Sequence, residues 1–232
     1  MRLAIVVPTL NEEDTVRRFL PAALAAADEV IVSDGGSTDA TVEIARSLGA
    51  RVVAGPPSRG GQLNRGAAAA MAGMAANPAG ADVLLFLHAD TTLPPGGAEA
   101  VREAVAHGAP GGAFLLRFGT DHPMQRLGSW LVSQRTRWLR VPLGDQAQWA
   151  TRETFERLGG FPDWPLLEDV DFMRRLRRLP GFTVIEQPVT TGARRFVELG
   201  AMRTVGINWL IWLLFFCGVS PHRLARLYRR VR

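Results

Sequence analysis

The first half of the chain alternates short apolar runs with longer stretches in which apolar residues recur at helical spacing. Runs rich in β-branched residues predict strands, and the stretches between them predict helices. The predicted strands are Leu3–Val7, Val30–Ser33, Arg51–Ala54, Val83–Leu87 and Ala113–Phe118, and the predicted helices are Glu13–Ala26, Ala40–Leu48, Gln62–Ala76 and Ala98–His107. Nearly all-apolar strands separated by helices are typical of a parallel sheet covered on both faces. The sequence therefore predicts an α/β fold with a Rossmann-like, mostly parallel sheet flanked by helices.

After about residue 119 the pattern becomes mostly helical. The expected elements are helices over Pro123–Arg140, Arg152–Leu158 and Glu168–Leu179 and a short strand near Thr183–Ile185. Val205–Val219 is then apolar on every helical face, and His222–Arg232 is basic and amphipathic. As a helix the apolar segment would reach only about 22 Å, which is short of the roughly 30 Å core of a bilayer. We expect a main domain over residues 1–196 and, over 197–232, helices that pack on this domain, on a second copy of the chain in a homodimer, or on a membrane surface.

Composition and charge exclude several classes of protein. Hydrophobic residues make up 47% of the chain and charged residues 21%, which permits a large core and excludes wholesale disorder. The net charge is +5, but the basic residues, all of them arginine, are dispersed and form no nucleic-acid-binding motif, so nucleic acid is not an expected partner. The single cysteine, Cys217, excludes a disulfide framework and suits a reducing compartment. Because the first apolar run is too short for a signal peptide, we expect a cytoplasmic protein, either free or peripheral on the inner face of the membrane.

Polar residues follow three of the predicted strands. Asn11 and Glu12 come after the first strand, Asp34 ends the second, and His88 and Asp90 follow the fourth. Each has an alternative explanation, such as a turn at Asp34 or a favourable charge at a helix N-terminus for Glu12. The carboxyl ends of parallel strands, however, meet at one edge of the sheet, where ligands bind in open α/β sheets. Because polar residues follow three strands that end at the same edge, we favour a ligand site there.

Two further segments carry candidate chemistry. The glycine-rich loop around Arg59 opens a helix, whose N-terminal amides attract anions, although it could equally be an ordinary loop. Glu168 and Asp169 fall in the first turn of another helix and point about 100° apart, so one can anchor the helix while the other acts as a general base. Alternatively, both carboxylates only stabilise the helix dipole. No dinucleotide-binding or P-loop glycine pattern follows the first strand, so those enzyme classes are not expected.

In their order along the chain, these segments resemble the family 2 glycosyltransferases, which have the GT-A fold. The matching segments are Pro8–Glu12, Ser33–Asp39, Arg59–Gly66, His88–Asp90 and the pair Glu168-Asp169. The resemblance runs from residue 4 to about residue 175. Within the family, the segments Gly144–Gln146, Gly159–Pro162 and Ala193–Phe196 resemble the arsenosugar-biosynthesis glycosyltransferases.

The resemblance implies inverting transfer of a sugar from a nucleotide-diphosphate sugar to an acceptor hydroxyl. The residues it implies for donor binding are Pro8, Asn11, Glu12, Asp34, Arg59, Gln62, Asn64, Ala89 and Arg194. Asp169 would be the catalytic base and Glu168 its support. Asp90, with His88 at the first position of the family's D-x-D motif, would hold Mg²⁺ or Mn²⁺. Because that position is histidine here, a non-catalytic nucleotide-sugar-binding protein of the same fold is the alternative.

Overall fold

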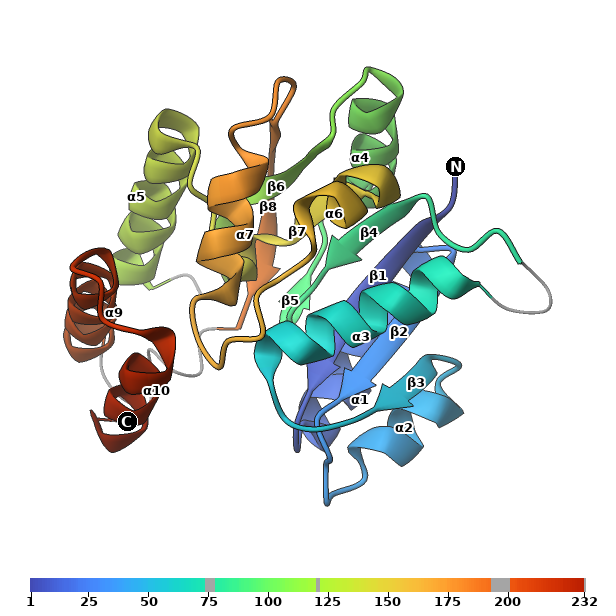
Figure 1. Ribbon diagram of the computed structural model, residues 1–232, viewed down its shortest axis with the longest axis horizontal. Helices are drawn as coiled ribbons and strands as arrows, with labels where there is room; N and C mark the ends of the chain where they lie inside the picture. The colour runs from blue at the N-terminus through green and yellow to red at the C-terminus, as the bar shows by residue number, and fades with distance from the viewer. Residues whose placement is uncertain (74–77, 120–121, 193–200, 232) are drawn as a thin grey trace.

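The computed structural model describes residues 1–73, 78–119, 122–192 and 201–231 (Figure 1). Its strands are β1 (Leu3–Thr9), β2 (Glu29–Asp34), β3 (Arg51–Ala54), β4 (Val83–Phe86), β5 (Thr91–Thr92), β6 (Gly111–Phe118), β7 (Gln148–Thr151) and β8 (Thr183–Thr191). Its helices are α1 (Glu13–Ala26), α2 (Thr41–Ser47), α3 (Arg59–Ala72), α4 (Gly97–Ala106), α5 (Pro123–Leu139), α6 (Arg152–Leu158), α7 (Glu168–Leu176), α9 (Ala201–Phe216) and α10 (Pro221–Val231), with a 3₁₀ turn η1 (Gly144–Gln146). The predicted α/β fold with a mostly parallel sheet is confirmed.

The strands form one eight-stranded sheet in the order β3-β2-β1-β4-β7-β6-β8-β5. Strands β1 to β4 are mutually parallel, β7 runs antiparallel to both β4 and β6, and β6 is parallel to β8. The sequence pattern did not predict β5 or β7, and it predicted only the first third of β8. Strand β7 joins the regular half of the sheet to the half that carries the C-terminal elements.

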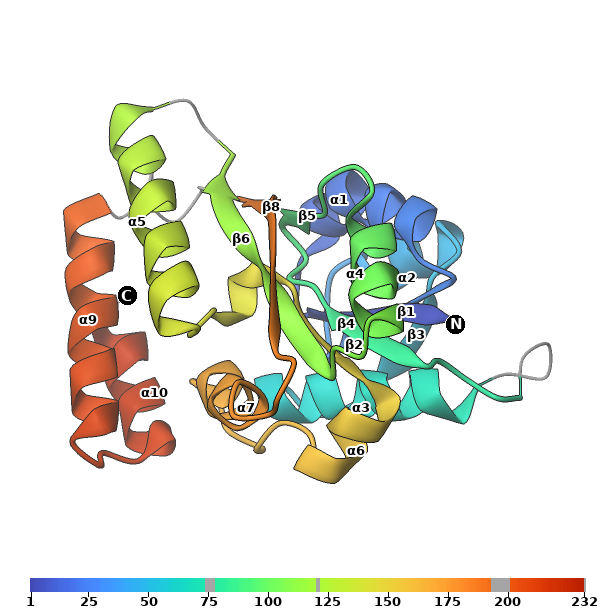
Figure 2. The same cartoon turned by 90° about the horizontal axis from the view of Figure 1, so that it is seen from above.

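Helices cover both faces of the sheet because strand side chains alternate in direction. On one face, Leu3, Ile5 and Val7 of β1 pack with α1, α2 and α4. On the other, Ala4 and Val6 pack with α3, α6 and α7 (Figure 2). The two cores leave the carboxyl ends of β1, β2 and β4 as the open edge of the sheet.

Helix α3 lies very close to the sheet. A Cβ atom on Gly66 would collide with the side chain of Val6 in β1. At its start the helix is equally close to the loop before α7, because a Cβ atom on Gly60 would collide with the carbonyl of Pro162. The helix begins at Arg59, earlier than the expected Gln62, because the Ser58 side chain caps it by accepting a hydrogen bond from the Gly61 amide. This cap places Arg59 in the first turn, at the open edge of the sheet.

The C-terminal helices contact the main domain. Ile211 of α9 and Leu224 of α10 form a small buried cluster with Leu167 and Val170 at the start of α7. Helix α9 also lies beside α5 in both views (Figures 1 and 2), and the Arg135 guanidinium of α5 sits 5.8 Å from the centre of a ring in Trp212. Within the described ranges, no helix combines the length and apolar character required to cross a bilayer.

Candidate active site

Two hollows adjoin at the open edge of the sheet. The first, which we call the β1 pocket, has a volume of about 190 Å³ and is lined by Pro8, Thr9, Leu10, Glu12, Arg59, Gln62, His88, Ala89 and Asp90. The second, the α7 pocket, has a volume of about 230 Å³ and lies between the start of α7, η1 and the C-terminal helices. Arg59, His88 and Asp90 line both pockets. The two hollows are therefore adjoining parts of one site.

Gln62 fixes the geometry of the β1 pocket. Its buried side-chain amide donates hydrogen bonds to the carbonyls of Thr9 (2.8 Å) and Ser33 (3.0 Å), at the ends of β1 and β2. These bonds tie α3 to both strands. The sequence-predicted donor residues Pro8, Glu12, Arg59, Gln62 and Ala89 come together around this pocket.

Asp34 and Asn11, which were also predicted to bind the donor, hold together the loops that border the pocket. The Asp34 carboxylate accepts hydrogen bonds from the amides of Gly36 and Ser37, both at 2.8 Å, and from the Thr9 hydroxyl. Burial opposes ionisation of Asp34, but these bonds, led by those from Ser37, bring its pKa below the ordinary value. The Asn11 side chain accepts from the Thr38 amide at 2.8 Å and so joins the loops after β1 and β2.

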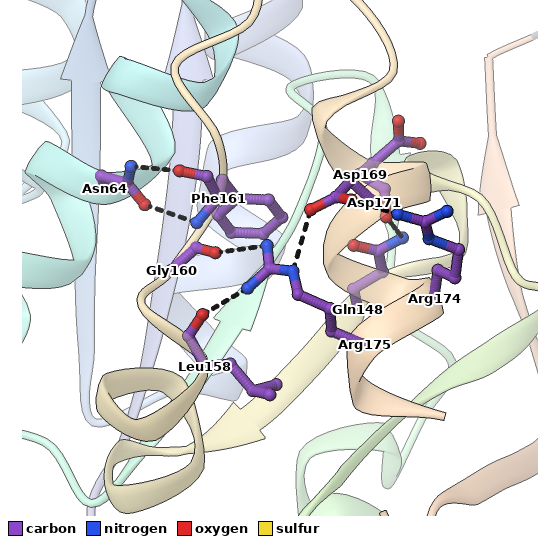
Figure 3. Close-up of polar contacts among 9 residues, drawn as sticks. All are labelled: Asn64, Gln148, Leu158, Gly160, Phe161, Asp169, Asp171, Arg174 and Arg175. Carbon is purple, nitrogen blue, oxygen red and sulfur yellow. Dashed lines mark hydrogen bonds and ion pairs between the residues drawn. The ribbon is translucent and has the colours of Figure 1, made fainter. Parts of the chain in front are cut away.

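Asn64 lies on the far side of α3 from the β1 pocket. Its side chain exchanges two hydrogen bonds with the backbone of Phe161, at 2.8 and 2.9 Å (Figure 3). Arg175 donates to the carbonyl of Gly160 in the same loop and to Asp171 on α7. Asn64 thus secures the loop that leads to α7. The remaining predicted donor residue, Arg194, lies outside the described residues.

Arg59 connects the two pockets electrostatically. Its Nε donates to Glu168 at 2.9 Å, and its terminal nitrogen lies 2.5 Å from Nε2 of His88. Burial lowers the pKa of Arg59, but the carboxylates of Glu168, Asp169 and Asp145 outweigh it and raise that pKa above its ordinary value. The guanidinium is therefore held as a cation at the junction of the pockets.

The geometry around His88 bears on the expected metal site. Guanidinium nitrogens only donate, so the hydrogen-bond network assigns the acceptor lone pair of His88 to Nε2 and turns it toward Arg59. In the described part of the chain, no group of three His, Cys, Asp or Glu side chains is arranged to hold a metal ion. Asp90 still fits the mode in which Mg²⁺ uses one carboxylate together with substrate phosphates. His88 does not fit as a ligand in this arrangement.

Glu168 and Asp169 have unlike surroundings. Glu168 is 1% exposed; one carboxylate oxygen bonds to Arg59, and the other, Oε2, has no hydrogen-bond partner among the described atoms. Burial raises the pKa of Glu168 to about 7, even though Arg59 opposes this. Both residues line the α7 pocket, but Asp169 accepts a 2.5 Å hydrogen bond from the Gly144 amide, and among the described residues no ion pair joins it to Arg59. This arrangement leaves Asp169 facing the pocket and Glu168 facing Arg59.

Asp145 is a site residue that the sequence analysis did not select. It lines the α7 pocket, and burial raises its pKa to about 6, an effect that Arg135 opposes and that Asp169 and Asp90 reinforce. Gly144–Gln146 had been noted only for the family resemblance, because no spacing argument could place this turn beside α7. Non-glycine residues with positive φ lie close to both acids in the sequence: Ala147 two residues after Asp145, and Leu167 directly before Glu168. Backbone strain of this kind clusters at functional sites.

We expect Glu168→Gln to flatten the pH dependence of stability. The folded-state pKa of Glu168, about 7, lies above its ordinary value of 4.5. The contribution of Glu168 to the free energy of unfolding is therefore fully present below pH 4.5 and is lost as the pH rises through 7. Between about pH 5.5 and 8, the unfolding free energy should fall by roughly 2 kcal/mol more in the wild type than in the variant. Urea unfolding at both pH values measures this, with Glu43→Gln on the exposed face of α2 as the control; parallel curves for wild type and Glu168→Gln would contradict it.

Comparison with known proteins identifies the family. The model of the family described as glycosyl transferase family 2 matches residues 4–161. The chain belongs to glycosyltransferase family 2. The resemblance to this family that the sequence motifs carry is thereby confirmed. No curated protein sequence matches the chain.

Solved structures of glycosyltransferases share the fold of this family 2 member. TarS of S. aureus is 18% identical with a TM-score of 0.62, over 89% of this chain and 65% of that one. The mannosyltransferase PcManGT from Pyrobaculum calidifontis, in complex with GDP-Man and Mn²⁺, is 21% identical with a TM-score of 0.60, over 90% and 62%. Glucosyl-3-phosphoglycerate synthase from Mycobacterium tuberculosis, in complex with Mn²⁺, UDP and glucosyl-3-phosphoglycerate, is 26% identical with a TM-score of 0.56, over 94% and 81%. The chain thus spans less than two thirds of the first two proteins. These likenesses agree with the predicted GT-A fold.

Proposed function

We propose that this glycosyltransferase binds a nucleotide-diphosphate sugar in the β1 pocket and transfers the sugar, with inversion, to a hydroxyl group held in the α7 pocket. The observation that supports this is the meeting of the two pockets at Arg59, His88 and Asp90, with Asp169 on the α7 side. Two fold neighbours have been solved in complex with a nucleotide sugar, one with GDP-Man and one with UDP-glucose. Resemblance to the arsenosugar-biosynthesis subgroup remains a prediction.

On the donor side, the diphosphate would lie at the start of α3. The helix N-terminus and the Arg59 guanidinium both favour negative charge at this point. Asp90 would hold Mg²⁺ or Mn²⁺, which when bound would neutralise charge on the leaving diphosphate. The loops after β1 and β2, fastened by Asn11 and Asp34, would border the nucleoside.

On the acceptor side, Asp169 is the proposed general base. Its carboxylate faces the pocket and the Gly144 amide fixes its orientation, so it can accept the proton of a hydroxyl that attacks the anomeric carbon. Glu168 acts through Arg59, which it holds at the junction of the pockets. The two adjacent carboxylates then have separate roles.

Calorimetric titration of UDP, GDP and TDP tests the donor site, with Mn²⁺ and with chelator, on wild type and Asp90→Ala. We expect one nucleotide to bind, with an affinity that falls by about tenfold on chelation and on the substitution. Metal-independent binding would remove Asp90 from the metal role. No binding of any nucleotide would overturn the proposed donor site, and binding without turnover on any acceptor would favour the non-catalytic alternative.

We further propose that the chain contacts an anionic lipid surface through α5 and α9. Trp138 is 82% exposed, and Trp130, Leu213 and Phe216 are more than half exposed on these two neighbouring helices. Exposed arginines lie on α10, which packs against α9, among them Arg223 and Arg226. Exposed tryptophans next to arginines suit the interface of an anionic bilayer.

Vesicle flotation at low salt measures this contact. We expect the protein to float with phosphatidylglycerol-containing vesicles and much less with pure phosphatidylcholine, and the double variant Trp138→Ala/Phe216→Ser to lose most of the bound fraction. The matched control is Leu48→Ala, an exposed apolar residue after α2. A protein that stays at the bottom of the gradient and sediments as a dimer that the double variant dissociates would instead assign the surface to a homodimer.

A further inference from the structure

The α7 pocket has two chemically different walls. Asp90, Asp145 and Asp169 place carboxylates along one wall. Ile211 and Trp212 of α9, together with Tyr228 of α10, add apolar and aromatic side chains to the lining. A ligand that fills this space meets both acids and apolar or aromatic side chains.

The acidic wall contains buried oxygen atoms that lack partners. Oδ1 of Asp145 and Oε2 of Glu168 are inaccessible to solvent and accept no hydrogen bond from the described part of the protein. Apart from these sealed atoms, Asp90, Asp145 and Asp169 line the pocket, and a carboxylate there can accept a hydrogen bond from a ligand hydroxyl. The described lining carries four carboxyl groups, from Asp90, Asp145, Glu168 and Asp169, and one guanidinium, from Arg59, so this balance of charge favours an uncharged acceptor over an anionic one.

The apolar wall is built by the C-terminal helices. Ile211 is 4% exposed and packs with Leu224, Leu167 and Val170, which fixes α9 against the start of α7. Trp212 is held on its other side by the Arg135 guanidinium. The helices over 201–231 therefore complete the pocket, and their contribution to it is a flat aromatic and aliphatic surface.

From these walls we infer that the acceptor is an uncharged amphiphilic alcohol. Its hydroxyl end lies among Asp145, Asp169 and Glu168, and its apolar body lies on Trp212 and Ile211. This inference rests on the proposed function. In the reaction, the acceptor oxygen forms a bond to the anomeric carbon, the bond from that carbon to the diphosphate oxygen breaks, the nucleoside diphosphate leaves with the electron pair, and Asp169 takes the hydroxyl proton. A polyanion such as the phosphoglycerate named for one fold neighbour does not suit these walls.

Three probes that all contain glucose test the inference: octyl β-D-glucoside, methyl β-D-glucoside and glucose 6-phosphate. Their binding to the nucleotide-loaded enzyme is measured by ligand-detected NMR, and transfer by mass spectrometry. In the wild type we expect the octyl compound to bind tightest and glucose 6-phosphate weakest. Trp212→Ala should weaken binding of the octyl compound by about tenfold and leave that of the methyl compound and the nucleotide unchanged.

Leu48→Ala is the control, because Leu48 is an exposed apolar residue after α2 that lines neither the β1 pocket nor the α7 pocket. It should leave all three affinities unchanged. Tighter binding of glucose 6-phosphate than of the octyl compound in the wild type would overturn the inference, whether or not Trp212→Ala folds. Equal effects of Trp212→Ala and Leu48→Ala would also overturn it. Failure of every nucleotide to bind would refute the proposed function instead, whereas nucleotide binding without octyl-glucoside binding would refute the acceptor class alone.

Discussion

Asp169→Asn should lower the rate of sugar transfer by about 10³-fold while the nucleotide dissociation constant stays unchanged. Asparagine has nearly the same shape and can still accept the hydrogen bond from the Gly144 amide, so the pocket keeps its geometry. It cannot take the proton of the attacking hydroxyl. The loss should therefore appear in kcat, which steady-state kinetics measures, and not in calorimetric nucleotide binding.

Asp171→Asn is the control on the same helix. The Asp171 carboxylate is held by Arg174 and Arg175 (Figure 3), and Asp171 is not among the described residues that line the α7 pocket. This substitution should cost stability and leave kcat within about twofold, since no general base is removed. If Asp169→Asn kept the rate within tenfold of the wild type, Asp169 would not be the base, and Asp145, which lines the same pocket, would be the next candidate.

Arg59→Met should have the second largest effect, a loss of about 10²-fold in kcat together with weaker nucleotide binding. The substitution removes the cation at the start of α3, where the diphosphate would lie. It also leaves the buried Glu168 carboxylate without its 2.9 Å ion pair, which favours the protonated acid. Loss of the cation is the consequence that reduces stabilisation of the negative charge on the leaving group.

Arg59→Lys separates charge from geometry. Lysine keeps the positive charge but lacks the planar fork that contacts Glu168 and His88 together, so its kcat should fall between those of the wild type and Arg59→Met. Arg17→Gln on the exposed face of α1 removes the same net charge far from the pockets and should leave both constants unchanged. Equal activity of Arg59→Met and wild type would remove Arg59 from the site.

The regular half of the fold could be predicted because local pattern decides it. Apolar runs such as Leu3–Val7 are buried on both faces, so they read as strands without any knowledge of their neighbours. Strand β7 could not be predicted, because it is only four residues long and begins with a polar residue, Gln148. Its pairing with β4 and β6 and the complete burial of Trp149 between them create the strand.

Part of the candidate site could likewise be predicted from the sequence, and part of it could not. That the polar residues at the ends of β1 and β4 lie around one pocket could be predicted, because parallel strands bring their carboxyl ends to one edge. Arg59 and Gln62 are three residues apart and share a face of α3, whereas Asn64 is about 200° around the helix from Gln62 and so faces the Phe161 loop instead. Asp145 and Trp212 come from a turn and a distant helix, and only tertiary packing brings them to the pocket.

The most direct test of a single displacement assisted by Asp169 is the anomeric configuration of the first product. Water can replace the acceptor, so slow hydrolysis of an α-linked glucose donor, carrying the nucleobase that binds, can be followed by proton NMR before the product mutarotates. Attack from the face opposite the diphosphate, with Asp169 as base, predicts that β-glucose appears first. Initial release of α-glucose would show retention and contradict the account.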